Sequence, residues 1–232
     1  MINEKGSKDR LTLTGFSAIG VMTSILGVIL GIASFEHGFF EVLHGNVAVK
    51  VGTIDAIGVA NRLWPNATEP AFTLIPNFFI TGIAAMTVSL VVIIWSIWFV
   101  RKQKLGGLVF LLLSIVQYLV GGGIAPFGLA IIIGIAALWI DRPLTWGWPI
   151  LPIVLRRVLA MPWLLLVITL SAVFTSTIWG AVFGNLPGTN NPDRVSSLLY
   201  DLLYLMEGLL PLMVISVFAH DSLRQIEKVP HG

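Results

Sequence analysis

The sequence predicts an all-α integral membrane protein, a six-transmembrane-helix bundle whose N- and C-termini both lie in the cytoplasm. Of its 232 residues, 56% are hydrophobic and 11% are charged, whereas a soluble domain is usually about 25% charged. Six apolar runs are separated by polar segments, and Lys and Arg are concentrated in alternate segments. This pattern is typical of a multi-pass protein, which we expect in the cell membrane with lipid as its surroundings.

The apolar runs define the predicted domains. A cytoplasmic head covers 1–10, a single transmembrane domain covers 11–220, and a cytoplasmic tail covers 221–232. The first run is longer than the apolar core of a signal peptide, about 7–15 residues, so it is predicted to be a retained span. The predicted spans are about 11–35, 77–100, 105–120, 125–140, 163–183 and 197–219.

The third and fourth runs are short for spans, because a helix needs about 17–25 residues to cross the hydrocarbon core. A single helix over 105–140 would be about 54 Å long, and Gly121, Gly122, Gly123 and Pro126 interrupt it. We predict a tight helical hairpin there. A re-entrant segment over 121–140 stays open as an alternative.

The basic residues support this topology. With the N-terminus inside, eleven Lys and Arg lie in inner segments and three in outer ones, which satisfies the positive-inside rule. The inner residues are Lys5, Lys8, Arg10, Arg101, Lys102, Lys104, Arg142, Arg156, Arg157, Arg224 and Lys228, and the outer ones are Lys50, Arg62 and Arg194. The outer loop 46–75 is long enough to fold over the outer face as a lid or interfacial segment.

Composition excludes several classes of function. The chain has no cysteine, which excludes iron–sulfur clusters, thiolate zinc sites and covalently attached haem c. No dinucleotide or phosphate-loop fingerprint is present, so no nucleotide is expected. The formal net charge of +2 is too small to indicate nucleic-acid binding.

Small residues form a stripe along 17–45, spaced alternately three and four apart through Gly20, Ser24, Gly27 and Gly31. Small side chains let helix backbones approach closely in lipid. We therefore expect this segment to be the packing centre of the bundle. The same stripe could also pair with a partner helix or with a second copy of the chain.

A polar cluster lies at the far end of that helix. His37, Glu41 and His44 share one helical face, with Glu36 beside them. Two imidazoles and a carboxylate suit a divalent metal such as zinc, iron, manganese or nickel. The alternative is that this end of the helix lies at the headgroup level, where the His and Glu side chains are hydrated and the neighbouring phenylalanines anchor the helix at the interface.

The last span carries a second set of polar residues. Tyr200, Tyr204, Glu207 and Pro211 are spaced four, three and four apart. A carboxyl at this depth is costly and marks a functional site or a buried pairing. Pro211 also leaves the carbonyl of Glu207 without its helical partner, so a cation or proton could bind there.

Two further polar residues are predicted at the same outer level. Gln117 ends the third span and Asn77 opens the second span behind Pro76. Each residue alone is typical of helix packing or capping. Their shared predicted depth in the membrane is what makes them candidates for one polar site.

Three motifs carry a resemblance to a known group. Glu36-His37-Gly38 with Glu41 and Gly45-Asn46, then Ile75-Pro76-Asn77, and Gly121-Gly122-Gly123 followed by Ala125-Pro126 resemble a group of uncharacterised bacterial multi-pass integral membrane proteins. The resemblance implies a membrane location and no particular activity.

The sequence favours a small transporter or an ion- or proton-handling protein over an enzyme. Its pocket would lie in the outer leaflet, with Glu36, Glu41, Tyr204, Glu207, Gln117 and Asn77 as candidate ligands. One alternative is a metal-dependent membrane enzyme using His37, Glu41 and His44. Another is an accessory or scaffold subunit that associates through the small-residue stripe.

Overall fold

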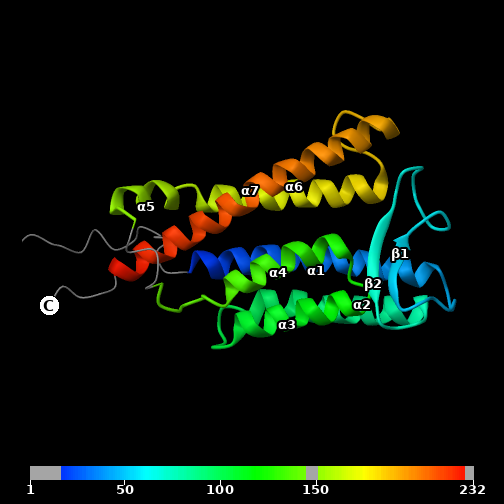
Figure 1. The fold of residues 1–232 in the computed structure, drawn as a ribbon, viewed down its shortest axis with the longest axis horizontal. Coiled ribbons are helices and arrows are strands. Elements are labelled where there is room, and N and C mark those ends of the chain that lie inside the picture. The colour runs from blue at the N-terminus through cyan, green and yellow to red at the C-terminus, as the bar shows by residue number, and fades with distance from the viewer. Residues whose placement is uncertain (1–16, 145–150, 228–232) are drawn as a thin grey trace, which may run out of the picture.

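The computed structural model describes residues 17–144 and 151–227, and most of these are helical (Figure 1). Every predicted apolar run contains a helix. The predicted head, residues 1–10, lies outside the described residues. In chain order the elements are α1 (Ala18–Leu43), β1 (Gly52–Ile57), β2 (Glu69–Thr73), α2 (Phe78–Ile94), the π-helical turn η2 (Trp95–Phe99), α3 (Gly106–Leu119), α4 (Ile124–Ala137), α5 (Ile153–Ala160), α6 (Trp163–Phe183) and α7 (Pro192–Glu227).

Four helical segments are long and apolar enough to cross a membrane: Ala18–Leu43, Phe78–Phe99, Ile153–Phe183 and Pro192–Ile226. These segments indicate a membrane protein. Helices α3 and α4 have 14 residues each, about 21 Å at 1.5 Å per residue, which is shorter than a hydrocarbon core of about 30 Å. They form the predicted hairpin, joined at residues 120–123.

Two helix boundaries differ from the predictions. The first helix begins at Ala18 and continues to Leu43, so Glu36, His37 and Glu41 lie within its last turns and His44 is its C-cap. The last helix continues to Glu227 and includes part of the predicted tail. Both helices extend beyond their apolar runs because their ends pack on other parts of the chain.

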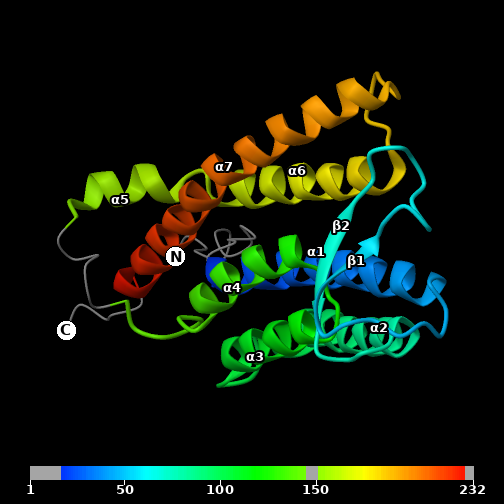
Figure 2. The ribbon, with the colours of Figure 1, turned by 45° about the vertical axis from the view of Figure 1, so that its right-hand side comes forward.

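Helix α1 is the centre of the bundle. It contacts α2, α4, α6 and α7, with α2 and α3 on one side and the α6–α7 pair on the other (Figures 1 and 2). The main core contains buried side chains from all of these helices, with Met22, Leu26 and Phe110 among the most enclosed. This arrangement agrees with the role predicted for the small-residue stripe.

The stripe is filled by the chain's own residues. A β-carbon at Gly27 would collide with Ser96 and Phe110, and one at Gly31 would lie 2.5 Å from Ile93. A β-carbon at Gly20 would lie 3.1 Å from the side chain of Arg101. These glycines therefore bring α2, η2 and α3 against α1.

The segment 46–75, which was predicted to be an outer loop, forms a β-structured cap that was not predicted from the sequence. Strands β1 and β2 pair antiparallel and cross the end of the helices (Figure 2). Strand β2 also pairs with the turn between α3 and α4, through a bridge from Thr73 to Val120 and a hydrogen bond from the Gly121 amide to Phe72. The predicted lid is thus attached to the hairpin by backbone hydrogen bonds.

At the opposite end, Asp221 of α7 holds the start of α1. Its carboxylate accepts hydrogen bonds from Ser17 Oγ at 2.5 Å, the Ala18 amide at 2.7 Å and the Ile19 amide at 3.1 Å. Buried amides at a helix N-terminus need such acceptors. Asp221 thereby ties the first described helix to the last.

We expect Asp221→Ala to reduce the free energy of unfolding by about 3 kcal/mol, because three buried donors lose an anionic acceptor. The measurement is unfolding in mixed detergent and SDS micelles, followed by circular dichroism. Asp201→Ala is the control, since Asp201 is exposed on the same helix. Equal stability of the two variants would contradict the tether.

Candidate functional site

A buried polar group lies beneath the cap, at the last two turns of α1. His37 and Glu41 are four residues apart, so they share one face of the helix. Their exposed fractions are 3% and 0%. Around them lie the turn between α3 and α4 and the start of strand β2, which brings Glu69 to His37. Three distant segments of the chain therefore enclose one site.

Glycines form the wall of the site. Gly121 and Gly123 have φ angles of +102° and +86°, a backbone conformation that favours glycine. A β-carbon at Gly121 would lie 2.5 Å from both carboxyl oxygens of Glu41, and one at Gly123 would lie 2.6 Å from Nε2 of His37. The missing side chains leave the space that the two polar groups occupy.

His37 links three polar partners. Its Nδ1 lies 2.9 Å from the carbonyl oxygen of Ala33 and 3.4 Å from Oε2 of Glu36, while its Nε2 lies 3.5 Å from Oε2 of Glu69. The side chains of Glu36 and Glu69 are 20% and 17% exposed. An imidazole between two partly buried carboxylates can accept or release a proton with little rearrangement.

Glu41 is the most completely buried carboxyl of the group. Both carboxyl oxygens are buried and have no hydrogen-bond partner in the part of the chain that the structure describes. Burial of an unpartnered carboxyl costs folding free energy, so buried polar groups are normally paired. A carboxyl in this state is poised to bind a proton or a cation.

A cavity of about 270 Å³ lies beside the site and is lined by residues of the cap, α4, α6 and α7. Glu69 lines it together with Ala125, Thr177, Ser196 and Tyr200. Since Glu69 also lies 3.5 Å from His37, it connects the cavity with the buried pair. Glu69 thus contacts His37, and Glu41 lies one helical turn further along α1 without a hydrogen bond to His37.

The structure does not bring His37, Glu41 and His44, the predicted metal set, together as one group of ligands. His44 Nε2 lies 3.2 Å from the Ala56 carbonyl and 3.0 Å from the Asn61 amide nitrogen, and its ring stacks on Phe78. Among residues 17–144 and 151–227, no group of three or more His, Asp or Glu side chains is placed to hold a metal ion. His44 is the C-cap of α1, and its ring is held by the cap residues Ala56 and Asn61 and by Phe78.

Glu207 and Tyr204 lie elsewhere. Both are exposed on α7, Tyr204 to 69%, whereas Glu41 is fully buried on α1. The structure therefore does not bring Glu41 and Glu207 into a common pocket. The spacing in the sequence predicted a shared stripe on α7, but packing against α5 and α6 decided which way that stripe faces.

Gln117 and Asn77 have structural contacts. Gln117 is buried and donates a hydrogen bond of 2.9 Å to Ser89 Oγ, joining α3 to α2. Asn77 caps α2 by accepting from the Ile80 amide at 3.1 Å, and it donates to Asn46 at 2.7 Å. Neither residue is among those that enclose Glu41.

Sequence reasoning missed Glu69, Thr73 and Thr81. The two threonine hydroxyls lie 3.1 Å apart and are buried beside the turn at Gly121. One feature of the sequence could have drawn attention to Glu69: it is the last charged residue before Arg101. The pairing of β2 with the α3–α4 turn, which brings Glu69 to His37, left no comparable pattern.

Asn61 was also missed, and it fastens the cap. Its side-chain nitrogen donates to the carbonyls of Phe40 and Ala56 at 3.0 and 2.8 Å, and its oxygen accepts from the Gly58 amide at 2.8 Å.

Comparisons with models of protein families, with curated proteins and with solved structures find no match to this chain.

Proposed function

We propose that this protein is a small membrane transporter or ion-handling protein that moves protons or small monovalent cations through the site beneath the cap. The observation that carries the proposal is Glu41, fully buried and without a hydrogen-bond partner in the described chain. An ionisable residue in such a place is costly and marks a functional site by default. Glu69, which lines the neighbouring cavity, lies 3.5 Å from His37 on the same helix face as Glu41.

The chemistry follows from the positions of these groups. Glu69 at the cavity would exchange a proton with solvent and with His37, whose Nε2 lies 3.5 Å from the Glu69 carboxylate, and Glu41, one helical turn along the same face of α1, would bind the proton or cation. A histidine between carboxylates can act as a proton shuttle.

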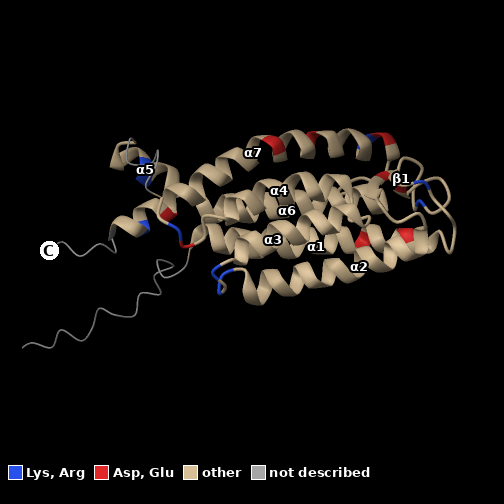
Figure 3. Ribbon diagram, turned by 60° about the horizontal axis from the view of Figure 1, so that its bottom comes forward, with Lys and Arg blue, Asp and Glu red and all other residues tan. Residues whose placement is uncertain are grey.

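We further propose the predicted topology, with six spans, cytoplasmic termini and a location in the cell membrane. Basic residues gather at the end of the bundle near α5, while few lie at the cap end (Figure 3), and such a bias favours a cytoplasmic α5 end. The two groups are Arg101, Lys102, Lys104, Arg142, Arg156, Arg157 and Arg224 near α5, and Lys50, Arg62 and Arg194 near the cap. The proposed site then opens on the outer face.

The test is cation flux in liposomes that contain the purified protein. A potassium gradient with valinomycin imposes a membrane potential, and an internal pH-sensitive dye reports proton entry. We expect Glu41→Gln to reduce the flux to that of protein-free liposomes, because the amide cannot bind and release the proton. Sodium and potassium fluxes are measured with ion-selective dyes in matched liposomes without valinomycin.

Asp55→Asn is the matched control. Asp55 is an exposed acid on β1 of the same cap, so its neutralisation changes the local charge equally and should leave the flux unchanged. The proposal fails if the unmodified protein carries none of the three cations above the protein-free level. It fails equally if Glu41→Gln carries as much as the unmodified protein.

A further inference from the structure

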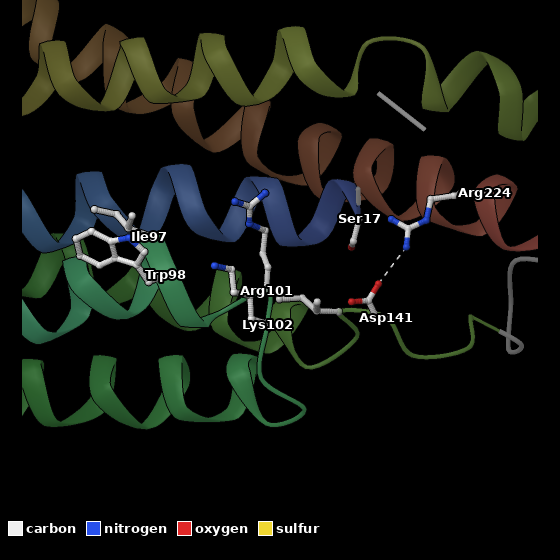
Figure 4. A pocket seen from close by; sticks show the side chains of 8 residues that line it. Ser17, Ile97, Trp98, Arg101, Lys102, Asp141 and Arg224 are labelled. Atoms are coloured by element: carbon white, nitrogen blue, oxygen red, sulfur yellow. Dashed lines mark hydrogen bonds and ion pairs between the residues drawn. The ribbon is translucent and has the colours of Figure 1, made fainter. Parts of the chain in front are cut away.

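A second cavity, of about 190 Å³, lies at the end of the bundle near α5, away from the proposed transport site. It lies beside the start of α1 and gathers side chains from distant parts of the chain (Figure 4). Its lining residues are Ser17, Ile97, Trp98, Arg101, Lys102, Ile140, Asp141 and Arg224. Three of these are cations and one is an anion.

Arg224 has more donors than this pocket satisfies. Its Nη2 donates to Oδ1 of Asp141 at 3.0 Å, while its Nη1 is buried and has no hydrogen-bond partner in the described chain. The Arg224 side chain is only 12% exposed and that of Asp141 is 58% exposed. A buried guanidinium that shares one mostly exposed carboxylate leaves positive charge for a further acceptor.

The other two cations come from the segment that follows η2. Lys102 and Arg101 line the same cavity, and the stem of Arg101 packs over Gly20 of α1. A larger residue at position 20 would displace that stem. The glycine thus helps to position Arg101 along the start of α1.

One wall of the cavity is apolar and open. Ile97 and Trp98 are 42% and 52% exposed, and both belong to the π-helical turn at the end of a candidate membrane span. Exposed tryptophan at a span's end is typical of the membrane interface. The pocket therefore combines anion-binding groups with an apolar wall at the level where lipid headgroups meet acyl chains.

We propose that this pocket binds the phosphate of an anionic phospholipid, with Arg101, Lys102 and Arg224 around the phosphate and the acyl chain along Ile97 and Trp98. Basic pockets between helices on the cytoplasmic side bind anionic headgroups in this way. Free phosphate carries the same anionic group but has no acyl chain to contact Ile97 and Trp98. The assignment is independent of the transport site.

The test uses nanodiscs and the fluorescence of Trp98. Brominated phosphatidylglycerol, titrated into phosphatidylcholine nanodiscs, should quench Trp98 at low mole fraction, and brominated phosphatidylcholine should not. Subtracting the signal of Trp98→Phe isolates this residue from the other tryptophans. We expect Arg101→Gln and Arg224→Gln each to weaken the apparent affinity about fivefold, as expected for one lost charge.

Two further variants keep the test decisive if Arg224→Gln does not fold. Asp141→Asn removes the competing carboxylate and should strengthen binding. Asparagine tolerates the positive φ of 55° at this position. Lys104→Gln is the matched control, because Lys104 lies in the same loop but does not line this cavity.

Three results would overturn the proposal. The first is equal quenching by the two brominated lipids. The second is an equal loss of affinity in Lys104→Gln and Arg101→Gln, which would indicate attraction to the surface in general. The third is full displacement of the brominated phosphatidylglycerol by millimolar inorganic phosphate, which would assign the pocket to free phosphate.

Discussion

Gly38→Ala is expected to destabilise the protein by about 2–3 kcal/mol, a large loss for the addition of a single carbon atom. A β-carbon at Gly38 would lie 2.8 Å from the carbonyl oxygen of Gly82 and 2.9 Å from the amide nitrogen of Met86. Both atoms belong to the backbone of α2, so no side chain can move aside. The two helices must separate instead, and α1 would shift at the residue next to His37.

Gly208→Ala is the matched control, and its expected effect has the opposite sign. Gly208 lies inside α7 and a β-carbon there would meet nothing within 4 Å. Alanine should therefore stabilise that helix by about 0.5–1 kcal/mol, because it lowers the entropy of the unfolded chain. Unfolding of both variants in mixed detergent and SDS micelles gives the comparison. Similar changes in the two variants would contradict the close contact of α1 with α2.

Glu41→Met is expected to stabilise the protein by about 1–3 kcal/mol while it abolishes cation flux. The carboxyl of Glu41 is fully buried and both oxygens have no hydrogen-bond partner in the described chain. Its replacement by an apolar side chain of similar length removes that desolvation cost. Substitution of a functional residue commonly raises the stability of the protein while it lowers activity.

The unfolding measurement and the liposome flux assay are made on the same preparation of Glu41→Met. Glu41→Gln serves as the control, because its amide is as polar as the carboxyl and should not gain the same stability. A loss of stability in Glu41→Met would mean that the carboxyl has a structural partner. The site beneath the cap would then be part of the packing of the fold.

The helices were predictable because their signal is local. Each of the six apolar runs contains a helix, and the small residues of α1 pack against the neighbouring helices. A run of apolar residues can satisfy its backbone groups in lipid only as a helix or within a closed barrel, so composition alone restricts the choice. The strands of the cap had no such restriction, since 46–75 mixes glycine, valine and polar residues without a clear period.

The candidate site was predictable in part. The spacing of His37 and Glu41 places them on one face of α1, and the glycines at 121–123 indicated a tight turn. The approach of that turn to Glu41 could not be predicted, because backbone hydrogen bonds to β2 bring it there. Backbone groups are common to all residues, so such pairing leaves little trace in the sequence.

Sequence by itself determined the class of protein, the positions of the helices, the central place of α1 and the uneven distribution of basic residues. These properties depend on neighbouring residues and on total composition. Only the tertiary structure decided that Glu69 reaches His37, that the ring of His44 is held by Ala56 and Asn61, and that Glu207 is exposed on α7. Each of these depends on how one element rotates and docks against another, which is set by packing over the whole molecule.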